Sequence, residues 1–168
     1  MFGKLFRKKQ EVPIDELGET LLQNLMRFVD SHVEIITQDK DLPFHNIDRD
    51  RLFTELLVLS FWNLNFLQYP FEVFNSVLRK FLQNSSKTQS ERDNLLNFME
   101  DRSKTYFDSW KETSENLPYF ASIIAKNIDE QLTFNVEVHL HLINFFSHMT
   151  QANATILKNI RDEMKIIL

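Results

Sequence analysis

The sequence predicts an all-α protein, a single-domain bundle of about six helices around a central apolar helix at residues 47–68. Apolar residues recur at three- and four-residue steps along most of the chain, which is the period of an amphipathic helix. Two Gly and four Pro among 168 residues leave little material for the tight turns of a many-stranded sandwich or barrel. Sixteen Phe predict a core dominated by aromatic packing.

The first predicted helix begins at Pro13, a residue suited to the first turn of a helix, and runs to about Thr37. Its apolar stripe is Ile14, Leu17, Leu21, Leu25, Phe28, His32 and Ile35. Gly18 lies beside this stripe, where the lack of a side chain lets another helix approach closely. The polar stretch 39–43 ends in Pro and is predicted to be a loop.

The second predicted helix begins at a cap, either Asn46 or Asp48, and ends near Gln68. A helix with so little polar surface belongs in the middle of a bundle or at an interface. We expect the side that carries Val58 and Trp62 to contact a partner protein or a second copy of the chain, because Trp is enriched at interface centres. The competing interpretation is that the fifth or sixth helix covers Trp62 as ordinary core.

Two prolines, Pro70 and Pro118, mark the starts of the third and fifth helices, and the polar stretch 84–90 precedes the fourth. Ser90 with Asp93 resembles a capping pair for that fourth helix. The apolar stripe of the third helix is Phe71, Phe74, Val77, Leu78, Phe81 and Leu82, and that of the fourth is Leu95, Met99, Tyr106, Trp110 and Leu117. The stripe of the fifth helix is Phe120, Ala121, Ile124, Ile128 and Leu132. The stripe of the sixth is Phe134, Val138, Phe145, Met149, Ala152, Ile156, Ile160 and Ile167.

Residues 133–142 fit two structures. Polar and apolar residues alternate there at every step, which is the period of a β-strand. A helix fits as well, since Val138, Leu142, Phe145 and Met149 continue one stripe. We favour the helix, because a lone strand has no ladder partner in a helical chain, and keep a minor strand as the alternative.

The same segment contains the sharpest candidate for a metal site, Glu137, His139 and His141. On a strand, alternate side chains share a face, so all three could bind one zinc or iron ion. On a helix, the two histidines lie about 200° apart and cannot chelate one ion together. With the helix favoured and no cysteine in the chain, we expect neither a metal nor a cofactor.

Three polar residues fall on the apolar stripes: His32, Asn63 and Arg102. Burial of an unpaired polar group costs about 1–3 kcal/mol, so we expect these residues to satisfy one another or to reach the surface. The functional alternative is an interior polar spot in a pocket, with Arg102 holding the anionic head of an apolar ligand. A small ligand is the less favoured interpretation.

The net charge of −5 is unevenly distributed, because residues 1–9 carry four bases and no acid. The remainder has 15 basic against 24 acidic side chains and would repel phosphates, so no nucleic-acid partner is expected. We predict a flexible arm at 1–12 ahead of a bundle domain at 13–168. The arm mixes apolar and basic residues suited to weak peripheral contact with an anionic membrane, and these are Phe2, Lys4, Phe6, Arg7, Lys8 and Lys9.

The sequence contains no recognisable catalytic constellation, because its serines lack a nucleophile-elbow context and its acids are scattered over polar helix faces. No apolar run approaches the roughly 20 residues of a membrane span, and no signal-peptide pattern occurs. We therefore expect a non-enzymatic cytoplasmic interaction module that acts through protein contacts or as a homodimer. The alternatives are a peripheral membrane protein that uses the arm and a bundle that binds a small apolar ligand or a metal.

Overall fold

The computed structural model describes residues 9–112 and 116–167, and over these residues it confirms the all-α prediction. The helices are α1 (Ile14–Gln38), α2 (Arg49–Phe66), α3 (Phe71–Ser85), α4 (Gln89–Glu112), α5 (Leu117–Ile128) and α6 (Val136–Glu163). A short 3-10 helix, η1 (Glu130–Leu132), joins α5 to α6. Two strands, β1 (Gln10–Pro13) and β2 (Met164–Ile167), form a small sheet.

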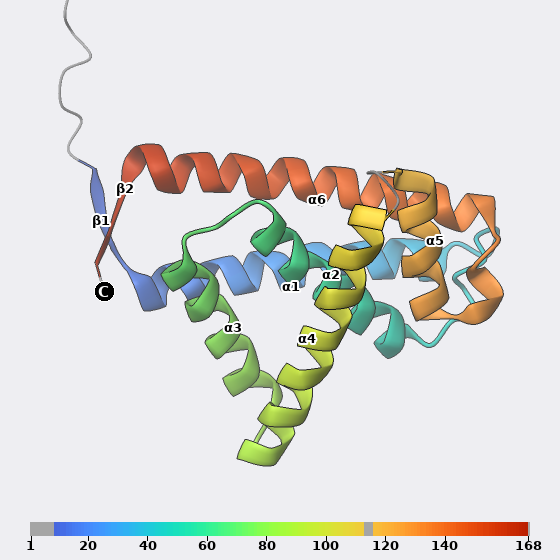
Figure 1. Cartoon of the computed structure of the whole chain (residues 1–168), viewed down its shortest axis with the longest axis horizontal. Helices are drawn as coiled ribbons and strands as arrows, with labels where there is room; N and C mark the ends of the chain where they lie inside the picture. Colours follow the sequence, from blue (N-terminus) through green and yellow to red (C-terminus); the bar gives the residue numbers. More distant parts are fainter. Residues whose placement is uncertain (1–8, 113–115, 168) are drawn as a thin grey trace, which may run out of the picture.

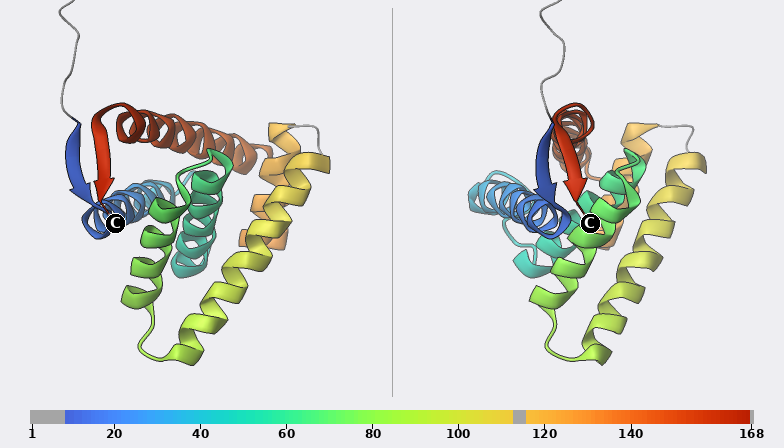
Figure 2. Two further views of the ribbon diagram at one scale, coloured as in Figure 1. Left: turned by 60° about the vertical axis from the view of Figure 1, so that its left-hand side comes forward. Right: turned by 90° about the vertical axis from the view of Figure 1, so that its left-hand side faces the viewer.

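The helices pack around α2, which confirms its predicted central place. Eleven of its 18 residues are buried. In Figure 1, α1 and α6 run along the long axis of the molecule in opposite directions, and α5 lies at one end. The hairpin formed by α3 and α4 projects to one side of that pair, as both views in Figure 2 show.

The start of α2 follows from its capping residue. The side chain of Asp48 accepts hydrogen bonds from two backbone N–H groups of the first turn, at 2.9 Å and 3.3 Å. These bonds satisfy donors that have no partner inside the helix. Of the two predicted caps, Asp48 is therefore the one used, and Asn46 lies in the preceding turn.

A close contact between α1 and α3 confirms the prediction for Gly18. A Cβ atom on this residue would lie 2.8 Å from Ser76 Cβ, closer than real Cβ contacts come, and 3.0 Å from the Ser76 carbonyl carbon, which is tighter than most such contacts. Ser76 Oγ also donates a hydrogen bond to the backbone oxygen of Ile14 at 3.1 Å. The partner helix that Gly18 admits is α3.

Near the ends of helices, several residues do not lie on the buried stripe that was predicted for them. Ile35 is 67% exposed whereas Ile36 is buried, because the buried face of α1 rotates by one position along its last turns. Leu117 begins α5 rather than ending α4, because Asn116 caps a new helix by accepting a hydrogen bond from the backbone N–H of Tyr119 at 3.2 Å. Leu132 lies in η1.

The segment 133–142 is helical from Val136 onward, so the favoured helix is confirmed and the strand alternative is wrong. Asn135 fixes this start by accepting a hydrogen bond from the backbone N–H of Val138 at 3.1 Å. The sheet instead joins β1 and β2 in parallel, which places Ile167 in a strand rather than in the sixth helix. The predicted boundary at residue 12 consequently falls inside β1.

Candidate functional site: a groove between α3 and α4

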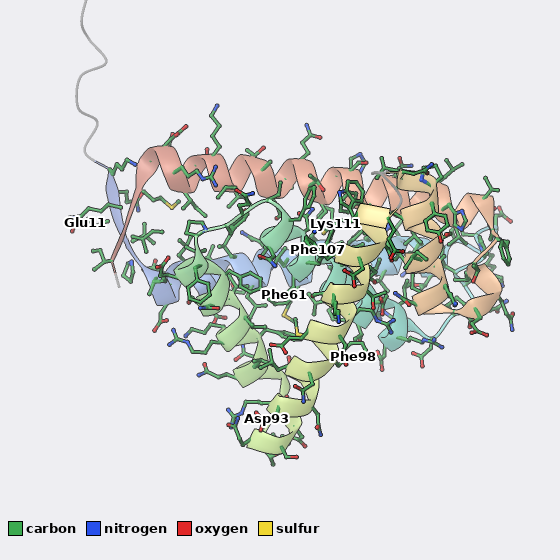
Figure 3. All side chains as sticks on the ribbon, viewed as in Figure 1. Glu11, Phe61, Asp93, Phe98, Phe107 and Lys111 are labelled. Atoms are coloured by element: carbon green, nitrogen blue, oxygen red, sulfur yellow. The ribbon has the colours of Figure 1, made fainter. Side chains whose placement is uncertain are left out.

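A groove of about 560 Å³ lies along the α3–α4 hairpin, and we call it the hairpin groove. Its aliphatic lining consists of Ile14, Leu78, Leu82 and Leu96. Its charged lining consists of Glu72, Arg79, Arg92 and Asp93, two residues of each sign. Figure 3 marks Asp93 near the tip of the hairpin, where the chain passes from α3 to α4. The groove is thus an aliphatic channel with charges of both signs along it.

The groove exists because the two helices bury different amounts of surface. On α3, Val73, Val77 and Phe81 are buried in the core, and the leucines of the groove occupy the neighbouring side. On α4, the buried residues are Met99 and Tyr106, so the first two turns stand away from the core. Half-buried leucines on both helices therefore face a space that the core does not fill.

A capping box closes the tip of the hairpin, and the predicted pair Ser90 and Asp93 is wrong. The backbone N–H of Glu91 donates to Thr88 Oγ1 at 3.2 Å, and the backbone N–H of Thr88 donates to Glu91 Oε2 at 2.9 Å. Both pairs have the same three-residue spacing, and α4 uses the earlier one because it begins at Gln89. Backbone hydrogen bonds from Thr88 and then Lys87 lower the pKa of the Glu91 carboxyl.

The polar side chains that line the groove differ in whether they already have a hydrogen-bond or ion-pair partner. Arg79 forms an exposed ion pair with Asp15 of α1. Asp93 accepts a hydrogen bond from Gln89 Nε2 at 2.7 Å. Arg92 is half-buried, and its Nε has no hydrogen-bond partner among the described residues. The groove can therefore offer both a carboxylate and a guanidinium to a partner.

A buried polar cluster fixes α4, the outer wall of the groove, to α2. Glu55 of α2 is 3% exposed and accepts a hydrogen bond from the hydroxyl of Tyr106, which is fully buried. Arg102 Nε lies 3.3 Å from Glu55 Oε1. Burial raises the pKa of Glu55, while the Tyr106 hydrogen bond and the Arg102 charge oppose that rise. Arg102 therefore pairs with the protein's own carboxylate, whereas the less favoured interpretation gave it the anionic head of a ligand.

The other two predicted polar residues have partners elsewhere, so His32, Asn63 and Arg102 do not form one spot. Asn63 Nδ2 donates to Thr150 Oγ1 at 2.8 Å, and Asn63 Oδ1 accepts from Asn153 Nδ2 at 2.9 Å. This network joins α2 to α6. The three residues do not hydrogen-bond to one another, because each lies on a different inter-helix contact, and the Arg102 side chain is 26% exposed.

His32 lies at the contact between α1 and α6. Its ring centroid is 4.7 Å from that of Phe145, and its Nε2 is buried without a hydrogen-bond partner among the described residues. Burial, followed by the charges of His141 and His148, lowers the pKa of His32 to about 4. The ring is therefore uncharged at neutral pH.

The predicted contact surface at Val58 and Trp62 is wrong, because both residues are only 3% exposed. The ring centroid of Trp62 lies 5.3 Å from Phe120 on α5, 5.9 Å from Phe146 on α6 and 6.2 Å from Trp110 on α4. Three helices that follow later in the sequence thus cover this side of α2. The competing interpretation, in which Trp62 belongs to the core, is correct.

The candidate metal ligands do not converge. His139 Nε2 lies 2.8 Å from the backbone oxygen of Thr133, and the His141 ring meets Phe44 edge-on at 6.1 Å. Because α6 is helical here, the two histidines point in different directions. No group of three His, Asp or Glu side chains suited to a metal ion occurs within residues 9–112 and 116–167.

Most of the predicted membrane-contact residues, Phe2, Lys4, Phe6, Arg7 and Lys8, lie outside the described residues. The remaining one, Lys9, donates a hydrogen bond from Nζ to the backbone oxygen of Arg161 at 2.5 Å. None of the helices in the described part of the chain combines the length and apolar character needed to cross a membrane.

A second surface, which the sequence analysis missed, lies at the start of α6, and we call it the α6 corner. It exposes Phe134 (91%), Val136 (70%) and Leu140 (57%). The alternation that suggested a strand is the signal for it. On a helix, a period of two places apolar residues on opposite sides, and only one side can face the core.

Comparisons of the chain with protein-family models, with curated proteins and with solved structures gave no match.

Proposed function

We propose that this protein is a non-enzymatic interaction module that binds an amphipathic helix of a partner protein in the hairpin groove. The observation that carries the proposal is the groove itself, about 560 Å³ of space between half-buried leucines with two acidic and two basic residues beside them. An amphipathic helix binds such a groove by placing its apolar face against the aliphatic residues. Its flanking charges then meet charges of the opposite sign.

The openness of the lining favours a helix over a small molecule. Of the residues around the groove, Ser76 is buried and the others are half-buried or exposed. A small-molecule pocket usually removes about 70–90% of its ligand's surface from water, which so open a lining does not do. A helix also covers the charged residues of the lining, including Arg92, whose Nε has no hydrogen-bond partner within residues 9–112 and 116–167.

The non-enzymatic part of the proposal rests on the surroundings of Glu55. This buried carboxylate is enclosed by Tyr106 and Arg102, and it does not line the hairpin groove. A catalytic acid or base must come within hydrogen-bond reach of a substrate. A cytoplasmic location is part of the same proposal, and the chain has no cysteine for the disulfides common in small secreted domains.

The test uses two matched substitutions, Leu96→Glu in the groove and Leu140→Glu at the α6 corner. Affinity capture followed by mass spectrometry first identifies proteins retained by the wild-type chain. We expect at least one of them to bind at least about tenfold more weakly to Leu96→Glu, because the new carboxylate must be desolvated against the partner's apolar face. A synthetic peptide of the contacting segment should gain helical circular dichroism when it binds.

The two variants must first show the wild-type helical signal and a similar melting temperature. Binding that is lost with Leu140→Glu and kept with Leu96→Glu would assign the contact to the α6 corner and contradict the proposal. Binding that neither substitution weakens would contradict it as well. Sedimentation velocity on the wild-type chain determines whether a second copy of the same chain is the partner.

A further inference from the structure

A smaller hollow lies between α1 and α6, and we propose that it binds one small uncharged ring molecule with a hydrogen-bond donor, such as a phenol. We call this hollow the α1–α6 crevice. It has a volume of about 170 Å³, and its floor is Leu64 of α2. This site is separate from the hairpin groove and does not depend on the function proposed above.

The shape of the crevice follows from the spacing of the two long helices. The helices α1 and α6 run side by side in opposite directions (Figures 1 and 2). Leu21, Leu25 and Phe28 line the crevice from α1, and Met149 and Ile156 line it from α6. The Phe28 ring packs on Phe145 with centroids 5.4 Å apart, so the wall at that end is aromatic and fixed. These side chains suit an apolar ring.

The volume limits the ligand to about one ring. Apolar cavities of about 150 Å³ in other proteins remain dry and take up benzene or xenon. The crevice, at about 170 Å³, therefore fits a six-membered ring with one small substituent. A longer acyl chain or a fused ring system would extend into water.

Charge limits the ligand further. The residues that line the crevice are apolar apart from two asparagines, Asn24 and Asn153, and none of them carries a charge. At the end of the crevice near Phe145, His32 is uncharged at neutral pH, since its pKa is lowered to about 4. A carboxylate would lose its hydration here without a cation to replace it. The crevice therefore favours a neutral ligand.

Asn153 supplies the polar contact. It is 4% exposed, and its Nδ2 donates to Asn63 Oδ1 at 2.9 Å. The hydroxyl of Tyr69 holds the same residue by donating to its backbone oxygen at 2.6 Å. Asn153 Oδ1 is the acceptor atom of this side chain, and no described residue donates a hydrogen bond to it. A ligand hydroxyl, which can donate, satisfies it better than a purely apolar ring does.

The binding test uses the full chain, labelled with carbon-13 at its five methionine methyl groups, and three probes: phenol, toluene and benzoate. We expect phenol to shift the Met149 signal saturably, since this residue lines the crevice. Toluene should bind several-fold more weakly because it has no donor for Asn153. Benzoate should bind at least about tenfold more weakly than phenol, because of its unpaired charge.

Ala152 and Ala154 offer a matched pair of variants. Both are exposed residues of α6, but only Ala152 lines the crevice. We expect Ala152→Phe to abolish the phenol-induced shift by filling the space and Ala154→Phe to leave it unchanged. Ala152→Leu provides a second filling variant if Ala152→Phe does not fold. The proposal is overturned if phenol leaves Met149 unshifted, if benzoate binds as well as phenol, or if both filled variants still bind.

Discussion

At the scale of single residues, the most consequential polar group in the core is Glu55. When a buried carboxylate is removed, the buried donors that it paired with lose their acceptor. Here Tyr106 and Arg102 both depend on Glu55, although they come from a helix about 50 positions later in the chain. The cluster thereby joins α2 to α4 in one arrangement.

We predict that Glu55→Ala lowers the free energy of unfolding by about 1–3 kcal/mol, because it removes the acceptor to which the buried Tyr106 hydroxyl donates. Glu55→Gln should cost less, since the amide oxygen can still accept that hydrogen bond. Urea unfolding followed by circular dichroism compares the two variants. Equal stability of Glu55→Ala and Glu55→Gln would contradict this role of the hydrogen bond.

The same carboxylate gives a pH dependence of known sign. The folded-state pKa of Glu55 is raised above its ordinary value of 4.5, so the folded protein holds more protons than the unfolded chain between those two pKa values. The contribution of Glu55 to stability is therefore present below pH 4.5 and declines as the pH rises through the folded pKa. Glu55→Gln should lack this decline, so the difference in unfolding free energy between wild type and the variant should show it as the pH rises.

His32 gives a second pH dependence, in the opposite direction. Its folded-state pKa of about 4 lies below the ordinary 6.5, so its contribution to stability is present above pH 6.5 and is lost as the pH falls toward 4. We predict that wild type loses roughly 1–2 kcal/mol more than His32→Leu over this interval, less than the full shift implies because the ring is partly exposed. Urea unfolding at several pH values measures the difference.

His45→Ala is the control for that measurement, because His45 is exposed. His45→Ala should keep the loss of stability at low pH that His32→Leu lacks, because it leaves His32 in place. Identical pH profiles for wild type and His32→Leu would contradict the assignment. His141 and His148 lie near His32, and their positive charges at low pH oppose its protonation.

At the scale of elements, the contact between α1 and α3 depends on one missing side chain. We predict that Gly18→Ala destabilises the protein by about 1–3 kcal/mol, because the new methyl group meets Ser76 Cβ and carbonyl carbon. At an exposed helical position the same change stabilises by about 1 kcal/mol. Thermal and urea unfolding measure the loss.

A double-mutant cycle with Ser76→Gly tests whether the loss comes from this contact. Removing the Ser76 side chain makes room for the methyl group, so the double variant should lose less than the sum of the two single losses. If the loss in the double variant equals the sum of the two single losses, the effect of Gly18→Ala does not come from its contact with Ser76.

The elements also show why a local pattern can support two structures. The alternation over residues 133–142 fits a strand as well as it fits the first turns of α6, and the Asn135 cap is the local feature that starts the helix. Val138 and Leu142 then face the core, while Phe134, Val136 and Leu140 remain exposed. The sequence predicted the helix, but it did not predict which of these residues would be left outside.

At the scale of the whole molecule, β1 and β2 bring together segments that lie about 150 positions apart in the chain. They pair in parallel with Val12 opposite Ile166, and both of these residues pack against the core. An exposed ion pair between Lys165 Nζ and Glu11 Oε1, 2.9 Å apart, lies beside them. The label in Figure 3 shows Glu11 at this end of the molecule.

We predict that deletion of residues 1–9 leaves the melting temperature nearly unchanged, whereas deletion of residues 1–13 lowers it by several degrees. The longer deletion removes β1 and the packing of Val12, and each kcal/mol lost corresponds to about 2–4 °C for a chain of this size. Differential scanning calorimetry compares the two truncations. An equal decrease for both would mean that residues 1–9 contribute to the folded core.

The sequence by itself determined the features that depend on local patterns. Helical periodicity and the scarcity of Gly and Pro predicted the helices and the central place of α2. Residue type and position singled out Gly18 and narrowed the cap of α2 to Asn46 or Asp48. Leu78 and Leu82 of the candidate site were on a predicted stripe. These features were accessible because a helix repeats every 3.6 residues whatever its neighbours are.

Only the tertiary structure decided which helix covers which face. Burial of Trp62, the pairing of Glu55 with Tyr106, and the space beside Leu96 depend on how α2, α3, α4, α5 and α6 are placed relative to one another. A periodic stripe shows that a face must be buried, but it does not specify the partner or the angle between the helices. The groove follows from that angle, because α4 contacts the core over only part of its length.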